Sequence, residues 1–155
     1  MRFKGTESSQ RGAAMVEAAL TMLTLLVLLF AIFEAGRMLN IQQTLANAAR
    51  EGARVSVLPA AATGTPPVPS DTLPTAAQVR LRVRTFLDAA GLNGAVVPDS
   101  DILVDQAYTP VAGSTIFSRV TVKVPYKVLS ISMFNVLPNL KLQGQATMRN
   151  ETNLK

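Results

Sequence analysis

One long apolar run lies near the start of the chain, and the later part alternates apolar and polar residues over short stretches. Residues 13–33 form an apolar stretch in which Glu17 is the one charged residue. At 1.5 Å per helical residue this stretch is about 30 Å long, which is enough to cross the hydrocarbon core of a bilayer. Helix-favouring sequence continues to Leu58 and is weakened at Gly36 and Gly52. The pattern predicts one helix over residues 13–58, with a transmembrane span over about 13–35.

Small residues recur at three- and four-residue spacing beyond the span, at Ala46, Ala49, Gly52 and Ala53. A stripe of this kind lets a second backbone approach a helix closely. Two partners are open at this point: a helix of another subunit, or the later part of the same chain. We predict that these residues pack the helix against one or both.

The rest of the chain predicts a small head of mixed structure. Residues 59–74 contain five prolines and one charge, as in a linker. Residues 75–90 show helical periodicity that ends before Gly91. Three alternating stretches follow, near residues 102–108, 120–126 and 140–148, which predict strands. The expected fold is α+β: a long N-terminal helix, then a head over residues 75–155 with one helix on a three- to four-stranded antiparallel sheet.

Composition removes most catalytic and metal chemistry. The chain has no Cys and no His, which excludes the Ser-His-Asp and Cys-His systems and His- or Cys-ligated zinc sites. The one carboxylate cluster, at Asp99, Asp101 and Asp105, lacks the turn glycine and closing glutamate of a calcium loop. We therefore expect a solvated turn before a strand there. We predict no catalytic residue, metal, cofactor or small-molecule substrate.

Charge indicates an orientation in the membrane rather than a nucleic-acid partner. The first twelve residues carry Arg2, Lys4 and Arg11 against Glu7, a net charge of +2. Basic residues beside a span stay on the cytoplasmic side, so residues after the span are expected outside the cytoplasm. The arginines of the 75–90 helix do not converge beside aromatic residues, and we expect no nucleic-acid binding.

A cleaved secretory signal is the simplest alternative for the apolar run. It requires small residues at fixed positions after the apolar core. The core ends instead in Ala31-Ile-Phe-Glu-Ala-Gly36, and helix-favouring sequence continues past it. The pattern favours a retained membrane helix.

Glu17 is the unusual residue of the span. An ionisable group at the centre of a membrane helix costs about 2.5–3.5 kcal/mol on insertion scales. Cleavage after Gly12 would create a new amine at Ala13, four residues before Glu17 on the same helical face. The two groups could then neutralise each other. The alternative is a carboxylate close enough to the cytoplasmic interface to reach water.

Three segments resemble the TadE-like family, the pilin-like (pseudopilin) components of the bacterial tight-adherence, or Flp-type, pilus system. They are Arg11-Gly-Ala-Ala-Met-Val-Glu17, Glu34-Ala-Gly-Arg37, and Ala46-Asn-Ala-Ala-Arg-Glu-Gly-Ala-Arg54. The resemblance implies cleavage by a prepilin peptidase between Gly12 and Ala13, which makes residues 1–12 a leader peptide, with Glu17 as the recognised and registry carboxylate. The residue after that glutamate is usually aromatic in this pilus class, and here it is Ala18.

The resemblance and the residues together predict a minor pilin-like subunit of a tight-adherence pilus or type IV-like secretion system. It would sit in the bacterial cytoplasmic membrane and assemble with other pilin-like subunits through its N-terminal helix. The alternative is an uncleaved single-pass membrane protein with a periplasmic interaction module. An enzyme tethered to the membrane is the weakest hypothesis, because no nucleophile–base pair or metal set is present.

Overall fold

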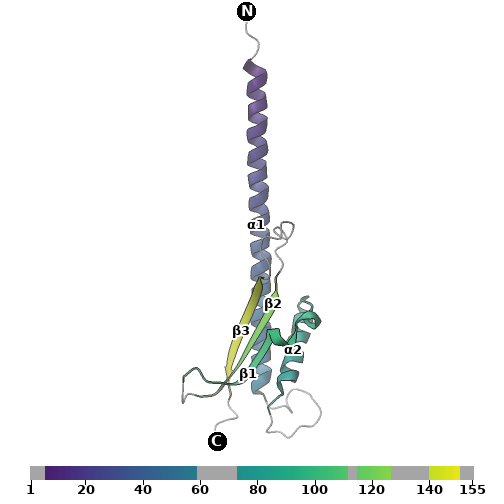
Figure 1. Cartoon of the computed structure of the whole chain (residues 1–155), viewed down its shortest axis with the longest axis vertical. Helices are drawn as coiled ribbons and strands as arrows, with labels where there is room; N and C mark the ends of the chain where they lie inside the picture. Colours follow the sequence, from purple (N-terminus) through teal and green to yellow (C-terminus); the bar gives the residue numbers. More distant parts are fainter. Residues whose placement is uncertain (1–5, 59–72, 112–114, 127–139, 151–155) are drawn as a thin grey trace, which may run out of the picture.

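A long helix carries a small α+β head on its second half. The computed structural model describes residues 6–58, 73–111, 115–126 and 140–150, with side chains from Gly12 onward. In Figure 1 the first half of the helix stands alone, and the head gathers beside the second half. The elements are α1 (Thr6–Val57), α2 (Ala76–Ala89), two short 3-10 helices (Gly94–Val96 and Asp99–Asp101), β1 (Ile102–Tyr108), β2 (Phe117–Pro125) and β3 (Lys141–Arg149). This is the predicted fold class.

The helix α1 begins at Thr6 and is therefore longer than the predicted 13–58. It continues through Gly12 and Gly36 without a break. A glycine costs a helix about 1 kcal/mol relative to Ala, which the many good helix formers around each glycine offset. The predicted linker falls mostly on residues 59–72, which lie outside the described residues.

The sheet is an antiparallel meander with the strand order β1-β2-β3. Val120 in the central strand pairs with Val104 on one side and with Ala146 on the other. The register shifts between Asp105 and Tyr108, where β1 is irregular. The described residues thus hold three strands, at the lower bound of the expected three to four. The apolar stretch around residues 129–137 falls outside the described residues.

The helix α2 has the ends that its sequence predicts. Thr75 is the N-cap and forms a capping box with Gln78, in which each side chain receives a hydrogen bond from the other residue's backbone N–H. Gly91 follows the helix with φ 78°, a backbone conformation that favours glycine. In Figure 1, α2 lies beside β1, at the opposite edge of the sheet from β3.

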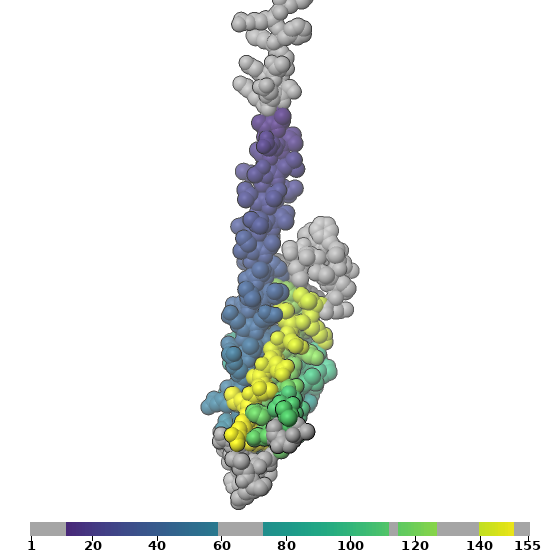
Figure 2. Space-filling model, turned by 90° about the vertical axis from the view of Figure 1, so that its left-hand side faces the viewer, coloured from purple at the N-terminus to yellow at the C-terminus, as the bar shows by residue number. Residues whose placement is uncertain are grey.

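The core lies between α1 and the two layers that cover it, the sheet and α2. The space-filling view in Figure 2 shows β3 and its neighbours packed along the second half of α1. Fully buried core residues come from four elements: Leu45, Ala48, Ala49 and Ala53 of α1, Val79, Val83 and Leu87 of α2, Ile102 of β1, and Val120 and Val122 of β2. Sequence periodicity predicted the three strands, although Leu140 lies outside β3 and is 41% exposed.

Two glycines allow the layers to approach α1 closely. A Cβ on Gly144 of β3 would lie 2.3 Å from the backbone carbonyl carbon of Leu45. A Cβ on Gly52 of α1 would lie 2.6 Å from the Cγ2 atom of Val83 in α2. Both distances are far shorter than van der Waals contact. The helix backbone therefore rests directly on the strand at Gly144.

A buried hydroxyl pair also joins α1 to the sheet. Ser56 and Ser118 are fully buried, and their Oγ atoms lie 2.5 Å apart. Ser56 donates to the carbonyl oxygen of Ala53 at 2.7 Å, so Ser118 donates to Ser56. Each buried hydroxyl has a partner, and this avoids the cost of an unsatisfied polar group.

Candidate functional site

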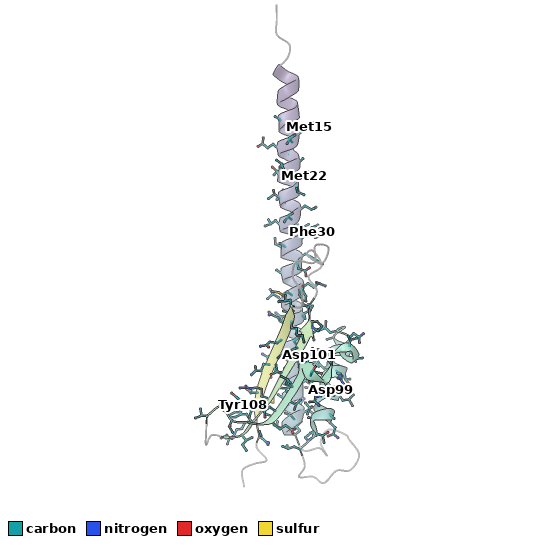
Figure 3. All side chains as sticks on the ribbon, viewed as in Figure 1. Met15, Met22, Phe30, Asp99, Asp101 and Tyr108 are labelled. Atoms are coloured by element: carbon teal, nitrogen blue, oxygen red, sulfur yellow. The ribbon has the colours of Figure 1, made fainter. Side chains whose placement is uncertain are left out.

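The first half of α1 is apolar on every side and is covered by nothing in the described chain. All side chains from Gly12 to Phe33 are exposed. Figure 3 shows Met15, Met22 and Phe30 projecting from the helix far from the head. An exposed apolar surface of this extent marks a site of membrane or protein contact. We call residues 12–33 the bare half of α1. Among the described helices, α1 is the one long and apolar enough to cross a membrane, by length and composition.

The predicted processing residues lie near the start of this bare half. Gly12 and Ala13 are exposed on a continuous helix, and no atom of the described chain lies within 4 Å of a Cβ placed on Gly12. Glu17 is exposed one turn later, where its carbonyl oxygen accepts a hydrogen bond of 2.9 Å from Thr21. The head touches none of these residues in the structure. Their roles in cleavage and registry stay predictions.

A polar junction ends the bare half and fixes the head to α1. The hydroxyl of Tyr126, one residue past β2, donates to Oε1 of Glu34 at 2.6 Å. Arg37 donates to the same oxygen at 2.9 Å, and its guanidinium lies 4.9 Å from the centre of the Tyr126 ring. The carboxylate thus receives two donors, and the cation covers the ring that supplies one of them.

Burial and hydrogen bonding raise the pKa values of two side chains in this junction. Tyr126 is 6% exposed, and this burial raises the pKa of its phenol, with a further rise from the hydrogen bond to Glu34. The hydrogen bond with Glu34 is the main cause that raises the pKa of Arg37, so its guanidinium stays charged. The junction therefore combines a charged pair with a neutral phenol at ordinary pH.

Sequence reasoning did not find this junction. It identified Glu34 as part of a family-like segment and Tyr126 as the end of a strand face. The two residues lie 92 positions apart, and no local pattern connects them. The available signal was the position of a carboxylate at the end of the apolar run, where a polar partner lowers the cost of partial burial.

The predicted helix-packing residues all lie on the side of α1 that faces the head. Ala49 and Ala53 are fully buried, Gly52 is buried against Val83 and Val120, and Ala46 is half-buried. Of the two partners that the sequence left open, the chain's own head occupies this stripe. A helix of another subunit would need a different face of α1 in this region.

Comparison with known protein families identifies a family domain that lies within α1. Residues 12–54 match the family model of TadE-like proteins. The chain carries a TadE-like family domain. The match begins at the glycine of the predicted cleavage site and ends near the C-terminus of α1. No curated protein and no solved structure matches the chain.

The TadE-like domain thus comprises the bare half, Glu34 and Arg37 of the polar junction, and the small-residue stripe. Proteins of this pilin family are typically structural rather than enzymatic. The head lies outside the matched residues, and the three arginines of α2 each pair with a carboxylate. Arg80 and Arg84 both reach Asp99, whereas Arg82 donates to Glu51 of α1 at 3.0 Å.

The expectation of a solvated turn before β1 is correct for Asp99 and wrong for Asp101. Asp99 is exposed, but Asp101 in the same turn is 7% exposed. Its carboxylate accepts hydrogen bonds of 2.9 and 3.1 Å from Nζ of Lys141 at the start of β3. Antiparallel pairing brings the two strand ends together across β2, a contact that no local sequence pattern shows. Among the described residues, no group of three or more acidic side chains could hold a metal ion.

Proposed function

We propose that this protein is a minor pilin-like subunit of a tight-adherence pilus or related secretion system. It is anchored in the bacterial cytoplasmic membrane by the bare half of α1, with its N-terminus in the cytoplasm and its head outside. A prepilin peptidase removes residues 1–12, and the mature chain joins other pilin-like subunits through α1. We propose a structural role, because Tyr126, Ser118 and Arg82 of the head use their polar groups to hold the head on α1.

One observation carries this proposal: an apolar helix that is bare for its first half, with a single carboxylate one turn after a glycine. The head covers one side of the second half of α1 but leaves the bare half free for lipid or for neighbouring helices. A soluble protein would bury such a surface. The TadE-like match covers this same half, starting at Gly12.

In the proposed mechanism, cleavage changes the chemistry around Glu17. The cut after Gly12 removes three basic residues and creates an ammonium group at Ala13. That group lies one helical turn from the Glu17 carboxylate and attracts it, either within a subunit or between neighbours. The pair replaces the water contacts that a lone carboxylate needs. The carboxylate thereby favours one register among packed helices.

Cleavage is tested by determining the N-terminus. The full chain is expressed in a pilin-free host with and without a prepilin peptidase, and its mass is measured after membrane extraction. We expect a mature chain that begins at Ala13 when the peptidase is present, and no cleavage in Gly12→Val. A chain that keeps its leader, while a control pilin in the same cells is cut, would support the uncleaved single-pass protein. Ala18, in place of the usual aromatic residue, is the observation that favours this alternative.

The role of Glu17 is tested by assembly rather than by insertion. In Glu17→Ala we expect normal membrane insertion and loss of co-purification with pilin-like subunits. Thr21→Ala is the matched control, because Thr21 lies one turn further along the same face and is uncharged. If Glu17→Ala assembles as well as Thr21→Ala, the carboxylate has no registry role.

A further inference from the structure

The second half of α1 has a face that the head leaves uncovered. Gly36, Asn40, Gln43 and Asn47 follow one another at spacings of four, three and four residues, so they share one side of the helix. All four are exposed. Leu45, in the centre of the covered side, is nine residues from Gly36, which is two and a half turns. The face formed by these four residues, here called the amide face, therefore points away from the head.

The amide face is unusual for a helix surface in water because it has no charge. Residues 38–49 contain no Asp, Glu, Lys or Arg, although half of this segment is outside the core. Solvent-facing sides of helices are normally rich in charged residues. The next residues on this side, Arg50 and Arg54, are charged. On this side of α1 the uncharged surface thus continues for about three turns beyond residue 35, because the charged Glu34 and Arg37 lie on the covered side.

Gly36 gives the amide face a place for close approach. No atom of the described chain lies within 4 Å of a Cβ built on it. Packing against the head therefore does not require glycine there, in contrast to Gly52 and Gly144. A helical glycine costs about 1 kcal/mol relative to Ala, and a second backbone crossing at this point would make use of it.

We propose that the amide face binds the amide face of a second copy of this chain, in parallel. Side-chain amides both donate and accept hydrogen bonds, so a row of Asn and Gln is complementary to itself. A charged face would repel its own copy. The two helices are parallel because both spans cross the same membrane in the same direction, and in this respect the inference rests on the proposed function. In such a symmetric pair each residue meets its own counterpart.

The ends of the contact follow from the same symmetry. Gly36 meets Gly36 at the crossing, and Asn40 and Gln43 meet their counterparts one and two turns later. Arg50 would meet a second Arg50, which is repulsive, and its guanidinium already donates to Oδ1 of Asn47 at 3.1 Å. The pair therefore diverges after Asn47. The small-residue stripe takes no part, because the head covers it.

Single-cysteine cross-linking tests this contact directly, since the natural chain has no cysteine. Gln43→Cys is on the amide face, and Gln42→Cys is the matched control: it replaces the neighbouring glutamine, which is also exposed but lies about 100° away round the helix. Each full-length variant is reconstituted in vesicles of phosphatidylethanolamine and phosphatidylglycerol without other pilins. The vesicles are oxidised and analysed on a non-reducing gel.

We expect disulfide-linked dimers at Gln43→Cys to exceed those at Gln42→Cys by about tenfold, because a disulfide requires Cα atoms about 4.4–6.8 Å apart. The excess should persist when the protein is diluted with lipid. Equal cross-linking at the two positions, or none at Gln43→Cys, would overturn the proposal. Both outcomes are independent of leader cleavage, so they leave the proposed function to its own test.

A second variant pair uses charge. With Asn47→Cys as the reporter, Gln43→Lys should reduce cross-linking to the level of random collision, since two ammonium groups would face each other. Gln42→Lys adds the same charge to the neighbouring position and should leave cross-linking unchanged. Neither side chain contributes to the core, so both variants should fold. Equal effects of the two lysines would refute the assigned face.

Discussion

The two halves of α1 have the same backbone conformation and opposite surroundings. Leu28 in the bare half is 57% exposed, whereas Leu45 in the second half is fully buried, with its backbone against Gly144 of β3. Both leucines fit a helix equally well, so helix propensity does not distinguish them. The head makes the difference, because it supplies a matching apolar surface to one half alone. An apolar helix therefore identifies a surface that requires an apolar partner. The position of the head decides which part of this surface is buried within the chain and which part is left for lipid or another protein.

The test with the largest expected effect replaces one leucine in each half of α1. Leu45→Ala should lower the free energy of unfolding of the head by about 3 kcal/mol, through lost burial and a cavity. Leu28→Ala should change it by less than about 0.5 kcal/mol, as surface substitutions do. Urea unfolding in detergent micelles measures both, with the fluorescence of the two tyrosines as the signal, since the chain has no Trp. Similar losses in the two variants would contradict the division of α1.

A second test compares two glycines. Gly144→Ala places a Cβ against the backbone of Leu45 and Ala46, and we expect a loss of about 2 kcal/mol from overpacking. Gly36→Ala has open space and should stabilise the helix by up to about 1 kcal/mol. The same unfolding measurement, on the monomeric protein in micelles, gives the sign of the change in the free energy of unfolding for each variant. A gain in stability for Gly144→Ala would show that β3 does not rest on α1.

The polar junction is expected to contribute less. Tyr126→Phe removes the hydrogen bond to Glu34 and keeps the ring under Arg37, and we expect a loss of about 1 kcal/mol. Hydrogen exchange of the α1 backbone near Met38 should increase as the head loosens there. Tyr108→Phe is the control, because the Arg119 guanidinium covers that ring in the same manner without joining it to α1. Equal exchange rates in the two variants would contradict the prediction that the Tyr126 hydroxyl holds the head on α1.

The smallest expected effect is the dependence of the free energy of unfolding on pH. Burial raises the pKa of Tyr126 above its ordinary value of 10.0, so the folded protein holds this proton more tightly than the unfolded chain. Its contribution to stability is complete below pH 10 and is lost as the pH rises through the raised pKa. In Tyr108→Phe, the remaining phenol can be titrated by its ultraviolet absorbance before and after unfolding in urea. A lower apparent pKa in the folded state would contradict the buried junction.

The sequence predicted helices and strands wherever the spacing of apolar residues within a short segment was sufficient to identify them. The apolar run predicted the long helix, Thr75 and Gly91 predicted the ends of α2, and alternation at Val120 and Val122 predicted the buried face of β2. Each of these signals arises within a few residues, because backbone geometry repeats every 3.6 or 2 residues. The match to TadE-like proteins rests on the same local information within α1.

Contacts between distant residues were decided by the tertiary structure. Ser56 and Ser118 meet across 62 positions, and Tyr126 meets Glu34 across 92. Asp101 was expected in solvent and is buried, because the sheet brings Lys141 to it. The sequence showed that α1 has a stripe of small residues, and the structure showed the amide face on the opposite side. The position of the head decided which of these is covered, because docking buries one side of a helix and leaves the opposite side exposed.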